Sequence, residues 1–179
     1  MREILFKAKR IDNGEWVEGY LLRDDVTGQY FIHASGNSVN ESDKVNEEGC
    51  LHFVAFEIDK DTICQYTGLT DKNDNKIWEN DVLMFHSNKN DLAKACYGEF
   101  YVIDVETLEK IDSVIGWHYE VIETDTISKC EPFNIPMPLT NDYIETCELE
   151  VIGNIFDNPE LLKGSEESEP TENKEADTK

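Results

Sequence analysis

The sequence predicts a mainly β protein: a barrel-like or sandwich-like body that ends in a short helix and a disordered acidic tail. Two observations support this fold class. Short runs of β-branched and aromatic residues recur between turn-forming residues, and no sustained apolar pattern of helical period precedes residue 156. The length of 179 residues allows a substantial core. We expect one β-rich domain over residues 1–163, or two subdomains of about 1–60 and 61–163.

A β-hairpin is predicted over residues 4–22, because Asn13-Gly14 separates two apolar runs and favours a tight type I′ turn. In the stretch 114–122 the apolar residues alternate with His118 and Glu120, which is the period of a half-buried strand. The central part of the chain could open a small SH3-like barrel. The stretches predicted as further strands are 29–33, 51–58, 62–66, 81–86, 99–105, 114–122 and 147–155.

The clearest helix signal is DNPELLKG, in which Asn158 can cap, Pro159 suits the first helical position and Gly164 can end the helix. This predicts one or two helical turns at the end of the fold. Segments dense in small polar residues predict loops at 34–49 and 87–95, and the proline-rich segment 128–142 predicts extended coil.

The chain is strongly acidic, with 39 acidic and 16 basic residues and a formal charge of −23. Residues 164–179 contribute six acidic and two basic residues without a large apolar one, which predicts a disordered tail. The other 163 residues still carry −19 of the total. This charge opposes direct binding to nucleic acid or to anionic lipid, whose phosphates attract Lys and Arg.

The sequence predicts a cytoplasmic protein without a membrane span. No apolar run approaches the roughly 20 residues that cross a bilayer, and the N-terminal stretch MREILFKAKR lacks the apolar core of a signal peptide. We expect reduced structural thiols, because the cysteines are odd in number and widely spaced, without the intervals typical of zinc ligands. The five are Cys50, Cys64, Cys96, Cys130 and Cys147.

The stretch DKNDNKIWENDVL, residues 71–83, resembles the first half of a calcium-binding loop through Asp71, Asn73 and Asn75. The sixth position, which should be glycine, is Lys76, and the twelfth, which should be a bidentate Glu, is Val82. Asn and Asp also tolerate the left-handed backbone region and bond to their own main chain. A turn between two strands therefore explains these residues better than a metal site.

Three segments resemble the YopX family of phage and prophage proteins: MREILFKAKR, QYTGLTDKNDNKIWENDVL and CELEVIGNIFDNPELL. The central family motif typically reads YTGLKDKNGKEIYEGDIV, and the terminal one reads EVIGNIYENPELL. Two family glycines fall on Asp74 and Asn80, which still tolerate positive φ and so favour a backbone role. The resemblance implies a mostly β fold and a phage origin, hence the bacterial host cytoplasm, and it transfers no catalytic residue.

Other polar groups favour structural roles. The histidines, which are His33, His52, His86 and His118, lack the spacing of metal ligands. Glu57, Asp59 and Asp61 could line one strand face, but Lys60 interrupts them and an exposed acidic strand end fits better.

A nuclease-like set of Asp104, Glu109 and Lys110 is disfavoured, because the last two are adjacent and would point to opposite strand faces. No phosphate-binding, nucleophile-elbow or Cys-His motif occurs. We therefore predict no catalytic, cofactor-binding or metal-binding residues, no cofactor and no enzyme.

The leading functional hypothesis is a phage accessory protein that binds a host or phage protein, with self-association as a further expectation. The basic N-terminus, with Arg2, Lys7, Lys9 and Arg10, could pair with an acidic surface on a second copy. One alternative is an acidic mimic of nucleic acid that inhibits a host DNA-binding protein. The other is a hydrolase whose metal is held by carboxylates from separate strands.

Overall fold

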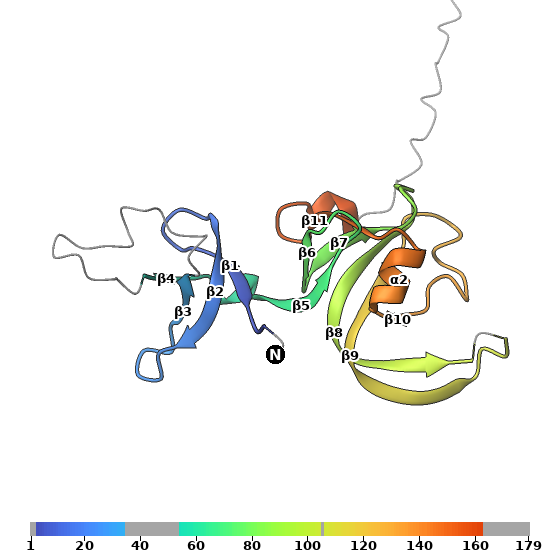
Figure 1. The fold of residues 1–179 in the computed structure, drawn as a ribbon, viewed down its shortest axis with the longest axis horizontal. Helices are drawn as coiled ribbons and strands as arrows, with labels where there is room; N and C mark the ends of the chain where they lie inside the picture. The colour runs from blue at the N-terminus through green and yellow to red at the C-terminus, as the bar shows by residue number, and fades with distance from the viewer. Residues whose placement is uncertain (1–2, 35–53, 105, 163–179) are drawn as a thin grey trace, which may run out of the picture.

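The protein is mainly β, as predicted, and consists of two antiparallel sheets with one short α-helix in the described part of the chain (Figure 1). The computed structural model describes residues 3–34, 54–104 and 106–162. The strand order is β4-β3-β2-β1-β5-β6 in the first sheet and β10-β9-β8-β7-β11 in the second. The predicted acidic tail and nearly all of the predicted loop 34–49 lie outside the described residues.

The first sheet packs its own small core of five buried residues on β1 to β3 and beside β4 and η1. These are Ala8, Val17, Ile32, Ala34 and Ile58. Its strands are β1 (Phe6–Lys9), β2 (Trp16–Arg23), β3 (Tyr30–Ala34), β4 (Ala55–Glu57), β5 (Cys64–Thr70) and β6 (Lys76–Trp78), with the 3₁₀ turn η1 (Lys60–Thr62) before β5.

The predicted N-terminal hairpin is present, but its turn is not type I′. The backbone N–H of Arg10 donates to the carbonyl of Glu15 at 2.9 Å, and that of Gly14 donates to the carbonyl of Arg10 at 3.0 Å. Gly14 has a φ of 73°, whereas Asn13 is not among the residues with positive φ. A type I′ turn needs positive φ at both positions. The loop between β1 and β2 is longer than a two-residue turn, and within it only Gly14 has a positive φ.

The second sheet forms the larger core. Its strands are β7 (Asp81–Met84), β8 (Leu92–Ile103), β9 (Lys110–Ile122), β10 (Met137–Pro138) and β11 (Glu150–Asn154). The prediction of a loop over 87–95 was wrong from Leu92 onward. The strand β8 begins at Leu92. Its first part is buried because the apolar side chains of Leu92, Ala93 and Ala95 pack into the hydrophobic core.

A short helix was not predicted. Helix α2 (Asn141–Thr146) begins after Thr140, whose side-chain oxygen accepts the backbone N–H of Tyr143 at 3.2 Å. The prediction of extended coil over 128–142 was thus wrong at its end, and most of residues 128–134 are turns. Six residues are too few to show a helical period. The predicted terminal helix is a single 3₁₀ turn, η2 (Pro159–Leu162).

Ion pairs join the N-terminal hairpin to the second half of the chain. Lys9 Nζ lies 2.6 Å from Asp157 Oδ1, and Trp16 Nε1 donates to Asp157 Oδ2 at 2.7 Å. Lys7 pairs with Asp81, and Arg10 pairs with Asp12. The described cations of the basic N-terminus therefore have partners within the chain, and self-association through them stays a prediction. None of the described helices could cross a membrane.

Candidate functional site

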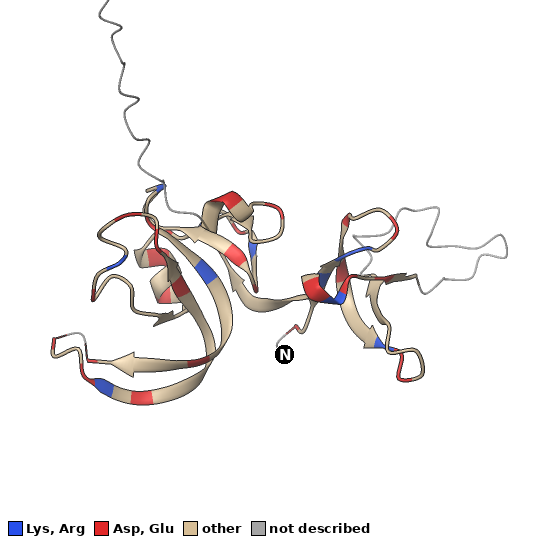
Figure 2. Ribbon diagram, turned by 180° about the vertical axis from the view of Figure 1, so that it is seen from behind, with Lys and Arg blue, Asp and Glu red and all other residues tan. Residues whose placement is uncertain are grey.

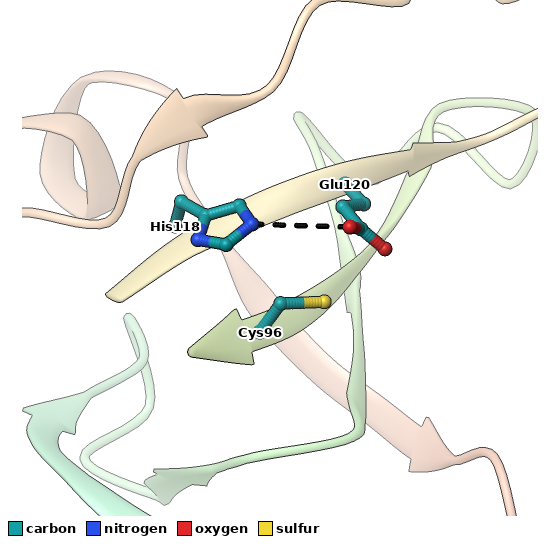
Figure 3. Close-up of side chains that lie close together, drawn as sticks. All are labelled: Cys96, His118 and Glu120. Carbon is teal, nitrogen blue, oxygen red and sulfur yellow. Dashed lines mark ion pairs between the residues drawn. The ribbon is translucent and has the colours of Figure 1, made fainter. Parts of the chain in front are cut away.

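The β8–β9 hairpin is the longest paired element, with strands of 12 and 13 residues. Figure 1 shows it as a curved ribbon that bends past α2 and β10. Cys96 lies opposite His118 and Lys94 lies opposite Glu120 in its register. Side chains two residues apart on a strand share a face. These four polar residues therefore meet on one face of the sheet, and we call Cys96, His118 and Glu120 the donor cluster (Figure 3).

His118 is the buried member of the donor cluster, with 3% of its surface exposed. The ring of Phe100 stacks on it with centroids 4.7 Å apart. Nδ1 of His118 lies 3.2 Å from the carbonyl oxygen of Gly116. Because a carbonyl can only accept, this contact places the proton of a neutral ring on Nδ1 and leaves the lone pair of Nε2 toward the cluster. Nε2 lies 3.9 Å from Glu120 Oε1.

The strand period predicted for 114–122 is present, but the predicted exposure of its faces is not. His118 was expected on the polar face and is buried, while Ile115 is 73% exposed. The reason is the long hairpin itself: its middle is covered on both sides, and its distal part extends past the core. The alternation of residues along a strand predicts which face of the sheet a side chain occupies, but it does not predict which other segments cover that face.

Glu120 and Cys96 complete the donor cluster. Glu120 Oε2 pairs with Lys94 Nζ at 3.1 Å. Burial alone would raise the pKa of Glu120, but the bond to Lys94 outweighs it and the pKa is lowered. Burial raises the pKa of the Cys96 thiol to about 12, so this thiol is protonated at neutral pH. Such a thiol is not an activated nucleophile.

A cavity of about 390 Å³ opens beside the donor cluster. His118, Glu120 and Phe100 line it from the hairpin, and Ile135 and Pro136 line it from the loop that precedes β10. Glu99, Tyr101 and Glu131 also line this cavity. Two of its three carboxylates already have partners, since Glu120 pairs with Lys94 and Glu99 accepts a hydrogen bond from Ser113 Oγ.

The opposite face of the hairpin carries exposed apolar side chains toward its distal part. Tyr97 pairs with Trp117, Glu99 with Ile115 and Tyr101 with Ser113, so these side chains share one face. We call Tyr97, Tyr101 and Ile115 the exposed hairpin face. All three are more than half exposed. The rings of Tyr97 and Trp117 meet edge to face, with centroids 5.0 Å apart.

The acidic stretch at residue 71 is a turn, as the sequence predicts. Asp71 is buried, and its carboxylate accepts the backbone N–H groups of Asn73, Asn75 and Val151 at 2.8 to 3.0 Å. Burial would raise the pKa of Asp71, but these hydrogen bonds together lower it. The bond to Val151 ties the turn to β11, so the carboxylate serves the fold.

Asp74 and Asn80 have φ angles of 63° and 66°. This confirms the backbone role predicted where the resemblance places glycines, since only a few residue types tolerate such angles.

The remaining candidates from the sequence do not converge on a site. Asp59 accepts the backbone N–H of Asp61 and caps η1, and Glu57 accepts a hydrogen bond from Gln29. Asp104 accepts the backbone N–H groups of Glu106 and Thr107 in the β8–β9 turn. Among the described residues, the donor cluster is the one group of potential metal ligands that the structure brings together. His52 and Cys50 lie outside the described residues.

The sequence contained a partial signal for the donor cluster. His118 and Glu120 are two residues apart in a predicted strand, and so share a face. Cys96 is 22 residues before His118 and lies between the predicted loop 87–95 and the predicted strand 99–105. Only the strand register places it opposite His118.

The fold and the hairpin define a mainly β protein of two antiparallel sheets. The chain belongs to the YopX family, whose model, described as YopX protein, matches residues 5–163. A comparison with curated proteins finds no match. Among solved structures, the chain is similar to the crystal structure of protein EF1440 from Enterococcus faecalis. That similarity has a TM-score of 0.46 and 22% sequence identity, and it covers 91% of this chain and 100% of the other.

Proposed function

We propose that this protein is a non-enzymatic phage accessory protein that acts in the bacterial host cytoplasm and binds another protein through the exposed hairpin face. The observation that carries the proposal is the exposure of Tyr97 (55%), Tyr101 (53%) and Ile115 (73%) on one face of one hairpin. Clustered exposed apolar residues mark interaction sites, and tyrosine is enriched in protein interfaces. Partner binding would bury this surface.

The surroundings of this face fit an interface. Glu99 lies between the apolar side chains, and Lys110 Nζ lies 3.3 Å from the centroid of the Tyr101 ring. Charged groups therefore lie within and beside this apolar surface, and protein interfaces combine such polar groups with apolar ones. The strands beneath are paired from Leu92↔Ile122 to Ile103↔Lys110. This pairing holds the tyrosines in place before binding and so lowers the entropy lost on binding.

The chemistry of the cavity gives less support to an enzyme. A hydrolase of the kind considered from the sequence would need carboxylates that converge on a metal or a water molecule. Glu99 instead accepts a hydrogen bond from Ser113 Oγ, and the potential metal ligands that the described residues bring together include a single carboxylate, that of Glu120. These interactions favour a structural cavity over a hydrolytic one.

The alternative of an acidic nucleic-acid mimic is motivated by the charge of −23. Such a mimic would present its carboxylates along one continuous face. Figure 2 shows acidic residues scattered over strands, loops and α2, with Lys and Arg among them. Several acidic residues are also neutralised by ion pairs within the chain. The scattered charge supports the interaction module more than the mimic.

The test is an affinity pull-down of the tagged full-length protein from bacterial host lysate. It is carried out after nuclease treatment, at low and high salt, and read by mass spectrometry. The proposal predicts a protein partner that survives high salt, because apolar contacts are not screened. The test variant combines Tyr97→Ser, Tyr101→Ser and Ile115→Ser. We expect it to lose the partner while keeping the far-ultraviolet circular dichroism of the parent.

The matched control combines Tyr20→Ser with Leu22→Ser, two side chains of similar exposure on β2 of the first sheet. It should retain the partner. A partner kept by the hairpin variant would overturn the proposal. A partner released by salt but not by nuclease would instead favour the mimic. Light scattering on the same variants separates a second copy of this chain from a foreign protein, since only self-association changes the mass of the purified protein.

A further inference from the structure

The donor cluster combines three kinds of ligand that one class of metal ion prefers. Cys96 offers a thiol sulfur, His118 an imidazole nitrogen and Glu120 a carboxylate oxygen, and these atoms all lie within 4.8 Å of one another. Sulfur and imidazole together favour borderline-soft ions such as Zn²⁺ over Mg²⁺ or Ca²⁺, which prefer oxygen. Figure 3 shows the three side chains on neighbouring strands, turned toward a common point.

The spacing is close to that of a tetrahedral centre. Zinc-to-ligand distances of about 2.0 to 2.3 Å imply ligand atoms about 3.3 to 3.8 Å apart. His118 Nε2 and Glu120 Oε1 are 3.9 Å apart. Side-chain rotations of about 1 Å would therefore bring all three atoms to binding distance without moving the strands. β8 and β9 each have neighbours on both sides, which keeps the cluster rigid.

The surroundings of His118 match those of a metal ligand. Its Nδ1 lies at hydrogen-bonding distance from the carbonyl of Gly116, 3.2 Å away. Metal-binding histidines usually donate their second N–H in this way, which fixes the tautomer and the direction of the free nitrogen. The Phe100 ring stacks on the imidazole and limits its rotation. The free Nε2 thus remains directed at Glu120.

Lys94 pairs with one carboxylate oxygen of Glu120 and leaves the other oxygen free for a metal. Its ammonium is 3.1 Å from Oε2 of Glu120, whereas Oε1 is the oxygen near His118. A thiolate and a carboxylate would together carry two negative charges, which match a divalent cation. Cys96 would release its proton to solvent on binding. The nearby ammonium should weaken the site by electrostatic repulsion.

We propose that Cys96, His118 and Glu120 bind one Zn²⁺ ion, with the fourth position reached from the cavity that His118 and Glu120 line. This goes beyond the interaction proposed for the exposed hairpin face and does not depend on it, although Tyr101 of that face also lines the cavity. Three protein ligands with one accessible position can hold a water molecule or a donor group from outside the chain.

The experiment uses Co²⁺ as a spectroscopic probe for Zn²⁺ on the full-length protein. The protein is reduced, kept under inert gas and titrated in excess Mg²⁺, which occupies the non-specific acidic surface. We expect one equivalent of Co²⁺ to produce a thiolate-to-cobalt charge-transfer band that Zn²⁺ abolishes. Cys96→Ser should remove the band. Cys130→Ser and Cys147→Ser, which alter an exposed and a half-buried thiol elsewhere, should keep it.

Two further variants protect the test against misfolding of Cys96→Ser. Glu120→Gln changes an exposed side chain and should weaken Co²⁺ binding at least about tenfold with the fold intact. Lys94→Gln removes the competing ammonium and should tighten binding severalfold. The proposal is overturned if the parent protein gives no such band, if Cys96→Ser retains it, or if Cys130→Ser or Cys147→Ser abolishes it. It is equally overturned if Glu120→Gln leaves the affinity unchanged.

Discussion

Lys7 and Asp81 form a buried ion pair between β1 and β7, with Nζ and Oδ1 2.8 Å apart. Their side chains are 13% and 2% exposed. The ammonium also lies 5.1 Å from the ring centroid of Trp16 and 5.4 Å from that of Trp78. Asp81 Oδ2 accepts the backbone N–H of Trp78 at 2.8 Å. Burial raises the pKa of Asp81, and Lys7 offsets part of that effect.

Replacing Lys7 should destabilise the protein strongly. Lys7→Met would leave the Asp81 carboxylate buried and unpaired, a change that typically costs about 3 to 5 kcal/mol. The double variant Lys7→Met with Asp81→Leu leaves no buried charge. Its loss of unfolding free energy should therefore be smaller than the sum of the losses in the two single variants. Urea unfolding measures both. Arg23→Met breaks the exposed pair with Asp25 and should change stability by less than about 1 kcal/mol. Equal effects at Lys7 and Arg23 would contradict this account.

Gly153 lies against the side chain of Asn158, which would have to move if residue 153 carried a Cβ atom. A Cβ atom at Gly153 would lie 2.3 Å from Asn158 Oδ1 and 2.9 Å from Asn158 Cγ. Gly153→Ala should therefore cost about 1 to 3 kcal/mol through overpacking. Gly116 provides the control, because a Cβ there meets no atom within 4 Å. Gly116→Ala should be neutral or stabilising by up to about 1 kcal/mol. Thermal unfolding of both variants measures the two effects. A smaller loss of stability for Gly153→Ala than for Gly116→Ala would contradict the close contact between Gly153 and Asn158.

Acid should release the contacts of Asp157. Burial alone would raise the pKa of this residue, but hydrogen bonds from Lys9, Asn154 and Trp16 lower it from 3.8 to about 2. A carboxylate with a depressed pKa contributes stability that is present above its unfolded-state pKa and is lost as the pH falls through its folded-state pKa. The loss should fall between about pH 4 and pH 2.

The variant Asp157→Asn isolates this contribution. Because the Asp157 side chain is 39% exposed, solvent screening reduces the contribution of its contacts to stability at neutral pH to about 1 kcal/mol. The difference in unfolding free energy between parent and variant should be constant above about pH 5 and should vanish below about pH 2. A difference that does not change with pH would contradict the prediction. Asp25→Asn alters an exposed carboxylate and controls for the change in net charge.

The left-handed turn at Asp74 predicts a substitution that stabilises the protein. Asp74 is exposed and has a φ of 63°, a conformation that glycine adopts without steric cost. Asp74→Gly should be neutral or stabilising by up to about 1 kcal/mol, whereas Asp74→Val should destabilise by more than about 1 kcal/mol. Chemical unfolding ranks the two. A valine tolerated as well as glycine would show that the turn is not left-handed in solution.

The carboxylate of Asp71 should stabilise the turn without calcium. Asp71→Ala leaves the N–H groups of Asn73, Asn75 and Val151 without their acceptor and should cost about 2 to 4 kcal/mol. Millimolar Ca²⁺ should not change the melting temperature of the parent protein. A calcium-dependent increase that Asp71→Ala removes would restore the metal-site interpretation of this stretch.

Local patterns determined much of the fold. The N-terminal hairpin, the turn at Asp71 and the strand period around His118 all follow from residues close in sequence, because backbone conformation and side-chain alternation are local properties. The positive φ at Asp74 and Asn80 is likewise a property of single residues. Helix α2 was missed because it is too short to show a period, and the start of β8 was missed because its apolar residues follow a polar loop.

The sequence by itself therefore determined the fold class, the family resemblance and the role of the acidic turn. Tertiary structure alone decided which distant residues meet. It placed Cys96 opposite His118, buried Lys7 against Asp81 and left Tyr97, Tyr101 and Ile115 exposed on the β8–β9 hairpin. The physical reason is that strand register and burial depend on packing between segments far apart in the chain, and the local sequence pattern does not contain that information.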